Sequence, residues 1–246
     1  MDRRMTPVVS LRGAQVAHQG RTVVHAIDLD IPRGSWFGLV GANGSGKTSL
    51  LKALAGRLPF SGGACLIDGR DMIADRAGRA EQFGFAPPAD RLPDSLRGCE
   101  MLAFVGGNLD RVHRNLGPLR QALGLDKLLD QWIGNCSAGM KQRLALAAAF
   151  AGGQKLVILD EPFNWLDPVA IFDLRLALRQ MVDDGLTLIT ALHDLNALVV
   201  ACDGGLILSH GKKRIDLSRG MLRDAAASPS LFEKEMIDIL RTGAAE

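Results

Sequence analysis

Apolar and polar residues alternate along the first part of the chain, over residues 8–40. The alternation is clear in Val8-Val9-Ser10-Leu11-Arg12 and in Leu29-Asp30-Ile31. A period of two is typical of strands that bury one face. Gln19-Gly20-Arg21 lies between two such stretches and is typical of a turn. The pattern therefore predicts an antiparallel β-region ahead of the strand at 36–40.

Three later stretches are almost continuously apolar, which is typical of strands buried on both faces of a sheet. They are residues 36–40, 156–159 and 186–192. Two shorter stretches, 64–67 and 83–86, also predict strands. Because helical segments separate these strands, we expect an α/β fold with a core of buried strands.

The pattern changes after Pro87, where a proline-rich start leads to helical apolar spacing. Glu100 to Val105 and Leu116 to Leu129 carry that spacing. We interpret about residues 88–152 as a helical subdomain inserted in a single domain of residues 1–220. Residues 221–246 predict one short amphipathic helix and a frayed end.

The strand at 36–40 runs into Gly41-Ala42-Asn43-Gly44-Ser45-Gly46-Lys47-Thr48. This stretch fits G-x-x-x-x-G-K-[ST], the phosphate-binding P-loop, and a helical segment follows it, as the motif requires. Its glycines let backbone N–H groups point at a phosphate, and the helix adds its positive dipole end. Lys47 is predicted to reach the β- and γ-phosphates, and the Thr48 hydroxyl to bind Mg²⁺. The predicted ATP-binding residues here are Gly41, Asn43, Gly44, Ser45, Gly46, Lys47, Thr48 and Ser49.

Two carboxylates, Asp160 and Glu161, end the apolar strand at 156–159, which is the Walker B pattern. We predict that Asp160 binds Mg²⁺ through its water shell and that Glu161 polarises the attacking water. His193 follows the strand at 186–192, at the kind of edge where open α/β sheets bind ligands. Paired acids can also be solvated turn residues and a lone histidine is usually structural, but the P-loop upstream favours the catalytic interpretation.

A helix is predicted after Cys136, because Ser137 can cap the apolar segment that follows Arg143. The free N–H groups at such a helix start form an anion site. Taken alone, this stretch is more simply an ordinary capped helix.

Composition restricts the function classes. The net charge of +2 gives no indication of nucleic-acid binding, and the basic cluster 212–214 is more simply a solvated turn. Four scattered cysteines without a C-x-x-C pair predict buried reduced thiols. Because the longest apolar run is too short to span a bilayer and no apolar segment follows the basic N-terminus, we expect a cytoplasmic chain.

Taken in order, these motifs resemble the nucleotide-binding subunit of an ABC transporter over roughly residues 8–215. The resemblance implies a P-loop NTPase (RecA-like) core with an antiparallel β-subdomain and an inserted helical subdomain. It implies that Ser137 and Gly139 belong to the signature loop, that Asp167 is the D-loop aspartate, and that His193 contacts the γ-phosphate. Lys47, Glu161 and His193 are then the catalytic residues, and ATP with Mg²⁺ the ligands.

The resemblance also implies two partners. One is a second nucleotide-binding subunit, with a homodimer expected, whose signature loop faces the P-loop across each ATP. The other is a transmembrane permease subunit in a separate chain, which places this chain peripherally on the cytoplasmic face of the membrane. Transported substrate and direction are not encoded in such a subunit.

Three positions depart from the family pattern. Pro88 stands where a glutamine usually contacts Mg²⁺ and the membrane partner, and proline offers neither a side-chain oxygen nor an N–H. His18 aligns with the aromatic residue, commonly tyrosine, that stacks on adenine. The signature reads Cys136-Ser137-Ala138-Gly139-Met140 rather than L-S-G-G-Q.

We therefore expect an ATP-hydrolysing subunit that powers a separate transmembrane transporter, with exporters as the nearest type. One alternative is a soluble ABC ATPase outside transport, although the chain has a single cassette, no sustained heptads and no C-x-x-C pair. The other is a hydrolysis-impaired ATP-binding subunit of a heterodimer, which Pro88 supports.

Overall fold

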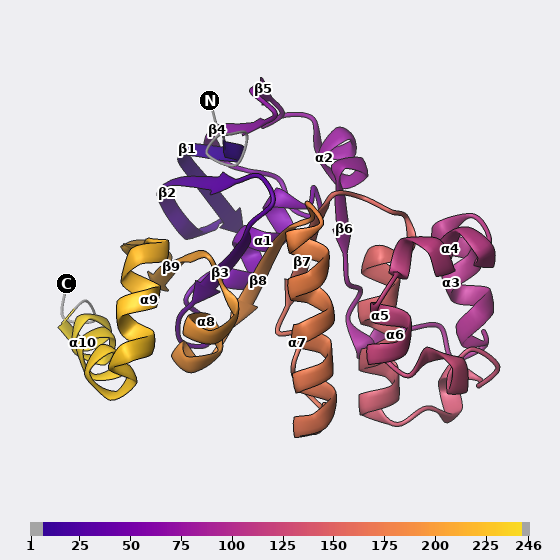
Figure 1. Cartoon of the computed structure of the whole chain (residues 1–246). Helices are drawn as coiled ribbons and strands as arrows, with labels where there is room; N and C mark the ends of the chain where they lie inside the picture. Colours follow the sequence, from indigo (N-terminus) through magenta and orange to yellow (C-terminus); the bar gives the residue numbers. More distant parts are fainter. Residues whose placement is uncertain (1–6, 243–246) are drawn as a thin grey trace.

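The computed structural model describes residues 7–242, and its first half contains a four-stranded antiparallel sheet of order β2-β1-β4-β5 (Figure 1). Its strands are β1 (Pro7–His18), β2 (Arg21–Pro32), β4 (Gly62–Ile67) and β5 (Arg70–Asp71). Val9, Leu11 and Ile31 are fully buried, while their neighbours Arg12 and Asp30 are exposed. The predicted antiparallel region and its turn are confirmed.

A second sheet has six strands in the order β10-β9-β3-β8-β7-β6. They are β3 (Trp36–Val40), β6 (Phe83–Phe85), β7 (Leu156–Asp160), β8 (Thr187–Leu192), β9 (Gly204–Ser209) and β10 (Lys212–Leu217). All neighbours pair in parallel except β9 and β10. Every residue of β3 and β8 is buried, as the continuous apolar runs predict.

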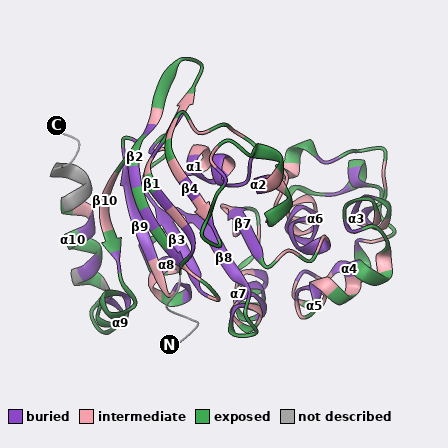
Figure 2. Ribbon diagram, turned by 90° about the horizontal axis from the view of Figure 1, so that it is seen from above, coloured by how far each residue is buried: buried purple, intermediate pink, exposed green. Residues whose placement is uncertain are grey.

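Two hydrophobic clusters lie on opposite faces of this sheet, because side chains alternate along each strand. One contains Leu39 and Ile158 and joins the antiparallel sheet to α1 (Lys47–Leu54). The other contains Val40 and Leu159 and includes residues of α7 (Pro168–Asp183) and α8 (Leu195–Ala201). Figure 2 shows this burial along the central strands.

A helical lobe lies on the side of the molecule where β6 forms the edge of the central sheet (Figure 1). Its helices are α3 (Gly98–Gly106), α4 (Leu109–Leu116), α5 (Leu119–Ala122) and α6 (Ala138–Ala151), with short 3-10 turns η2 (Ala89–Arg91), η3 (Leu125–Lys127) and η4 (Ile133–Asn135). Another helix, α2 (Arg76–Gln82), precedes β6. The expected insertion of helices is present.

The helical spacing from Leu116 to Leu129 corresponds in the structure to two short elements, α5 and the 3-10 turn η3. Gly117 and Gly124 both have positive φ, 47° and 58°, which interrupts a right-handed helix on either side of α5.

The C-terminal segment differs from its prediction. It forms two helices, α9 (Arg219–Ala227) and α10 (Pro229–Thr242), rather than one short helix. Proline is tolerated at a helix start, and Pro229 begins the second helix. Leu222 and Phe232 are buried in the main core, so these helices pack on the domain. Residues 243–246, part of the expected frayed end, lie outside the described residues.

Within residues 7–242, no helix has the length and apolar character needed to cross a membrane.

Candidate nucleotide site

The strand register brings three sequence motifs to one edge of the central sheet. Val40 pairs with Leu192, and Ala191 pairs with Asp160, so the carboxyl ends of β3, β8 and β7 are neighbours. The P-loop, Glu161 and His193 each follow directly after one of these ends. This is the edge where open α/β sheets bind ligands.

The P-loop has the backbone that its glycines predict. Gly44 and Gly46 have φ of 79° and 102°, in the left-handed region, and α1 begins at Lys47. A Cβ at Gly41 would lie 2.1 Å from the carbonyl oxygen of Leu208, so only glycine fits there. The loop therefore ends in the N-terminus of α1, where free backbone N–H groups favour an anion.

Lys47 is buried, and its ammonium donates to the carbonyl oxygens of Gly41 at 2.7 Å and Ala42 at 3.1 Å. Burial lowers the pKa of Lys47, while the nearby carboxylates of Glu161 and Asp160 act in the opposite direction. A buried ammonium held by weak neutral acceptors is suited to pair with phosphate oxygens.

The residues predicted to bind Mg²⁺ meet in the structure. Burial raises the pKa of Asp160, while the neighbouring Thr48 hydroxyl acts in the opposite direction, so the two side chains lie close together. In the part of the chain that the structure describes, no hydrogen-bond partner is found for Asp160 Oδ1 or for the buried Ser45 hydroxyl. Orphaned buried oxygens are costly unless another group satisfies them. Because Mg²⁺ prefers oxygen ligands from one or two side chains together with phosphates, these residues fit that ion.

The carboxylate of Glu161 is held from two sides. His193 Nε2 lies 2.6 Å from Oε1, and Asn164 Nδ2 donates to Oε2 at 2.7 Å. Although burial by itself raises the pKa of Glu161, these hydrogen bonds hold it below its ordinary value. Sequence reasoning missed Asn164, since an asparagine three residues after Glu161 is also an ordinary turn residue.

The predicted signature and D-loop residues have local structural roles. Ser137 caps α6, its hydroxyl accepting from Met140 N at 3.3 Å, which confirms the capping prediction. Asp167 caps α7, accepting from Ala170 N at 2.9 Å, and its other oxygen meets Arg143 at 3.2 Å. A Cβ at Gly139 would lie 2.7 Å from the Trp165 carbonyl oxygen, so this glycine lets α6 approach the loop after β7.

A pocket of about 470 Å³ opens beside the Walker B carboxylates. It is lined by Lys52, Asp160, Glu161, Asn164, Trp165, Gln142, Ala145 and residues 85–90, Pro88 among them. Pro88 and the predicted water-activating residue Glu161 thus line the same pocket. Ser137 and Gly139 are not among the lining residues described.

Three other predicted ATP-binding residues, His18, Asn43 and Ser49, lie on or near the P-loop side of the fold without a described contact that tests their role. His18 is exposed and pairs with Arg21 at the end of the β1–β2 hairpin. A Cβ at Gly46 would lie 2.8 Å from the Val23 carbonyl oxygen, so this hairpin reaches the P-loop. Asn43 is exposed on the loop and Ser49 is half-buried in α1. Contact of His18 with a base stays a prediction.

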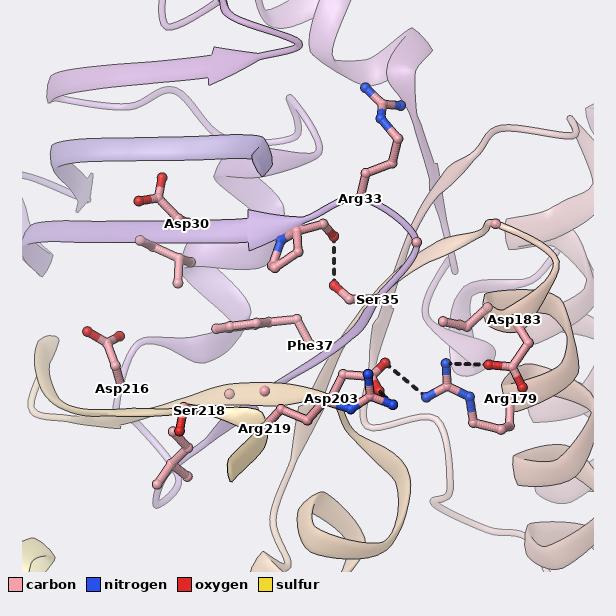
Figure 3. Close-up of a pocket in the computed structure, with 18 of the residues that line it drawn as sticks. Asp30, Arg33, Ser35, Phe37, Arg179, Asp183, Asp203, Asp216, Ser218 and Arg219 are labelled. Carbon is pink, nitrogen blue, oxygen red and sulfur yellow. Dashed lines mark hydrogen bonds and ion pairs between the residues drawn. The ribbon is translucent and has the colours of Figure 1, made fainter. Parts of the chain in front are cut away.

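A larger hollow of about 1400 Å³ lies at the opposite edge of the central sheet (Figure 3). Arg179, one of its charged residues, meets two others, Asp203 at 2.9 Å and Asp183 at 3.0 Å. Phe37 and Gly204 lie near the amino ends of their strands, away from the P-loop. We therefore assign the nucleotide site to the other edge.

Comparison with known proteins agrees with this geometry. Residues 24–164 match the family model described as ABC transporter. An uncharacterized ABC transporter ATP-binding protein from Sinorhizobium fredii is 32% identical over 86% of this chain, which spans 65% of that relative's length. The lantibiotic transport ATP-binding protein SrtF from Streptococcus pyogenes is 28% identical, over 92% of this chain and 99% of that protein.

Solved structures show the same fold. The ATP-binding subunit of an ABC transporter superposes with a TM-score of 0.81 at 24% identity, covering 94% of this chain and 99% of that one. A dimeric ATP-binding cassette in a post-hydrolysis state with ADP and Pi gives 0.76 at 20% identity, covering 86% and 98%. The chain therefore belongs to the ABC transporter family and is an ATPase subunit with the ATP-binding-cassette fold.

Proposed function

We propose that this chain binds and hydrolyses ATP to power a separate transmembrane subunit, and that the transporter is an exporter. The proposed ATP hydrolysis rests mainly on the position of the Glu161 carboxylate. His193 and Asn164 hold it at the sheet edge that also carries Asp160, Thr48 and the P-loop. Export is supported by relatives such as the Nod factor export ATP-binding protein I of Burkholderia lata, 30% identical over 83% of this chain.

The proposed mechanism assigns each step to a residue. The P-loop N–H groups and Lys47 bind the β- and γ-phosphates and stabilise the charge that develops on them. Thr48 and Asp160 would hold Mg²⁺, which supplies charge neutralisation on the phosphates when bound. Glu161 orients the attacking water and takes its proton, and His193 contacts the γ-phosphate.

We further propose that two copies complete each site. Ser137 caps a helix whose N-terminus is an anion site, yet it does not line the pocket beside Glu161. In a two-fold dimer the Ser137 loop of one copy would face the P-loop of the other. A homodimer attached to the cytoplasmic face of a membrane protein follows from this proposal.

The decisive experiment uses Glu161→Gln, which keeps the size of the side chain but removes the carboxylate, an effect typically worth about 10²- to 10⁴-fold in rate. Hydrolysis should stall while ATP stays bound and joins two subunits. We expect light scattering after size exclusion to show a dimer with ATP and a monomer with ADP.

The second change Ser137→Ala should weaken the ATP-bound dimer. A monomer of Glu161→Gln with ATP, or an equally stable dimer under all these conditions, would contradict the shared site.

A further inference from the structure

The loop after β7 contains an amide that the expected chemistry does not use. Asn164 Nδ2 donates to Glu161 Oε2 at 2.7 Å, and the backbone N–H of Asn164 donates to the Glu161 carbonyl at 3.3 Å. Both contacts join the same two residues, so the side chain of Asn164 is aimed at the carboxylate by the turn that contains it. A hydrogen bond to an ionised group is among the stronger ones in proteins.

The backbone of this loop is held in an uncommon conformation. Glu161 and Trp165 have φ of 52° and 64°, in the left-handed region that bulky side chains rarely adopt. Such residues persist only where their surroundings enforce them, and they cluster at functional sites.

Side chains of α6 help to hold the loop in this conformation. Gln142 Nε2 donates to the carbonyl oxygens of Pro162 at 3.3 Å and Glu161 at 3.5 Å. At the other end of the loop, Arg143 contacts Asp167 at 3.2 Å. The loop that carries Asn164 is therefore fixed to the helix of the signature motif at two points.

We propose that Asn164 is a positioning residue for ATP hydrolysis, which holds Glu161 Oε2 so that Oε1 faces the attacking water. The inference rests on the proposed role of Glu161 as base. Asn164 fixes one oxygen, and the other is the atom that meets His193 at 2.6 Å. When His193 turns to the γ-phosphate, Oε1 becomes free to accept from water while Oε2 keeps its partner. An unheld carboxylate would rotate about its terminal bond, whose torsional preference is broad.

The test compares Asn164→Ala and Asn164→Asp in the full chain, with Gln121→Ala as a control that removes an exposed carboxamide from α5. In Asn164→Ala, kcat should fall about 10- to 100-fold, the range for a lost hydrogen bond to a charged group. KM for ATP and the affinity for a fluorescent ATP analogue should stay within about twofold, because the hydrogen bonds described for Asn164 go to Glu161 and none goes to the P-loop. The control should retain its kcat.

The aspartate variant separates positioning from packing. It keeps the size of asparagine but sets a second carboxylate against Glu161, so kcat should fall further than in Asn164→Ala. A role in packing alone predicts the reverse order, because aspartate fills the same space and can form the same turn. Thermal melting and analogue binding verify that each variant is folded.

A double variant completes the design. Added to Glu161→Gln, Asn164→Ala should lower the residual single-turnover rate less than about twofold, because the two residues act as one unit. A kcat of Asn164→Ala within twofold of wild type, or a milder aspartate variant, overturns the inference alone. If Glu161→Gln itself hydrolyses ATP at the wild-type rate, the proposed base is wrong, and that result is distinguishable.

Discussion

Several residues that the sequence marks for nucleotide chemistry also stabilise the local fold. Ser137 and Asp167 cap helices, and Gly139 allows close packing against Trp165. Loss of an N-cap typically costs about 1 kcal/mol. Reduced activity in variants of Ser137 or Asp167 therefore needs a parallel stability measurement before it is assigned to phosphate binding.

Pro88 stands where the family resemblance leads us to expect a glutamine, and it lines the pocket with Asp160 and Glu161. Pro88→Gln should leave ATP affinity within a few-fold but change basal turnover, because it adds a side-chain oxygen that can bind Mg²⁺ or water. Calorimetry and steady-state ATPase assays measure the two effects. Pro93→Gln, at an exposed turn of the helical lobe, is the control. Equal turnover in all three proteins would remove Pro88 from any role in hydrolysis.

Burial of Cys65 is expected to make the folded chain less stable as the pH rises into the alkaline range. Burial raises its pKa from 9.0 to about 11. Below pH 9 the Cys65 thiol is neutral in both the folded and the unfolded chain, so its contribution to the free energy of unfolding is fully present. Between about pH 9 and 11 the unfolded chain loses the proton first, and up to about 3 kcal/mol of stability is lost. Urea unfolding at pH 8 to 11 should show a steeper decline for wild type than for Cys65→Ala; parallel declines would contradict this.

At the scale of elements, α1 needs support at both ends, since its N-terminus carries the P-loop. Its C-terminal end is bound by Arg79, a fully buried side chain of α2. The guanidinium donates to the carbonyl oxygens of Ala53, Met72, Ile73 and Leu58. Arg79 thus fixes α1 to α2 and to the segment after β5. Its buried positive charge is stabilised by backbone carbonyl oxygens rather than by a carboxylate.

Replacement of Arg79 should therefore destabilise the core beneath the P-loop. Arg79→Leu leaves buried carbonyl oxygens without a donor, and each such group costs about 1–3 kcal/mol. We expect a lower midpoint of urea unfolding monitored by circular dichroism. Arg70→Leu, at an exposed position of β5, should stay within about 0.5 kcal/mol of wild type. If both variants unfold at the wild-type midpoint, Arg79 does not support α1.

At the scale of the whole molecule, the central sheet and the helical lobe carry different parts of the proposed site. The P-loop and Walker B residues lie on the sheet edge, and Ser137 begins a helix of the lobe. The loop 161–167 connects the two, through Gln142 and Arg143. Movement of the lobe would therefore act on the Glu161 carboxylate.

A site shared between copies makes activity depend on concentration. Specific ATPase activity of the purified chain should rise with protein concentration, because a monomer cannot assemble the site. Activity measured from nanomolar to tens of micromolar tests this expectation. Constant specific activity over that range would contradict the homodimer.

The fold class and most of the candidate site residues could be predicted from residue types and their spacing alone. The P-loop, Walker B and helix-cap patterns are local, because each depends on residue types at fixed short spacings, and strand patterns follow from burial on one or two faces. Gly41 to Thr48, Asp160, Glu161 and His193 were thus found, and the structure brings them to one edge of the sheet.

Which side chains meet could not be predicted from the sequence, because it depends on the folded arrangement of the chain. Helical spacing from Leu116 to Leu129 could not show that glycines at positive φ break that segment, nor could it show two helices after Ser218. The contact of Asn164 with Glu161 depends on two left-handed residues in one loop, and the burial of Arg79 depends on packing between α1 and α2. Such contacts are set by backbone conformation and by elements far apart in sequence, which residue spacing alone does not specify.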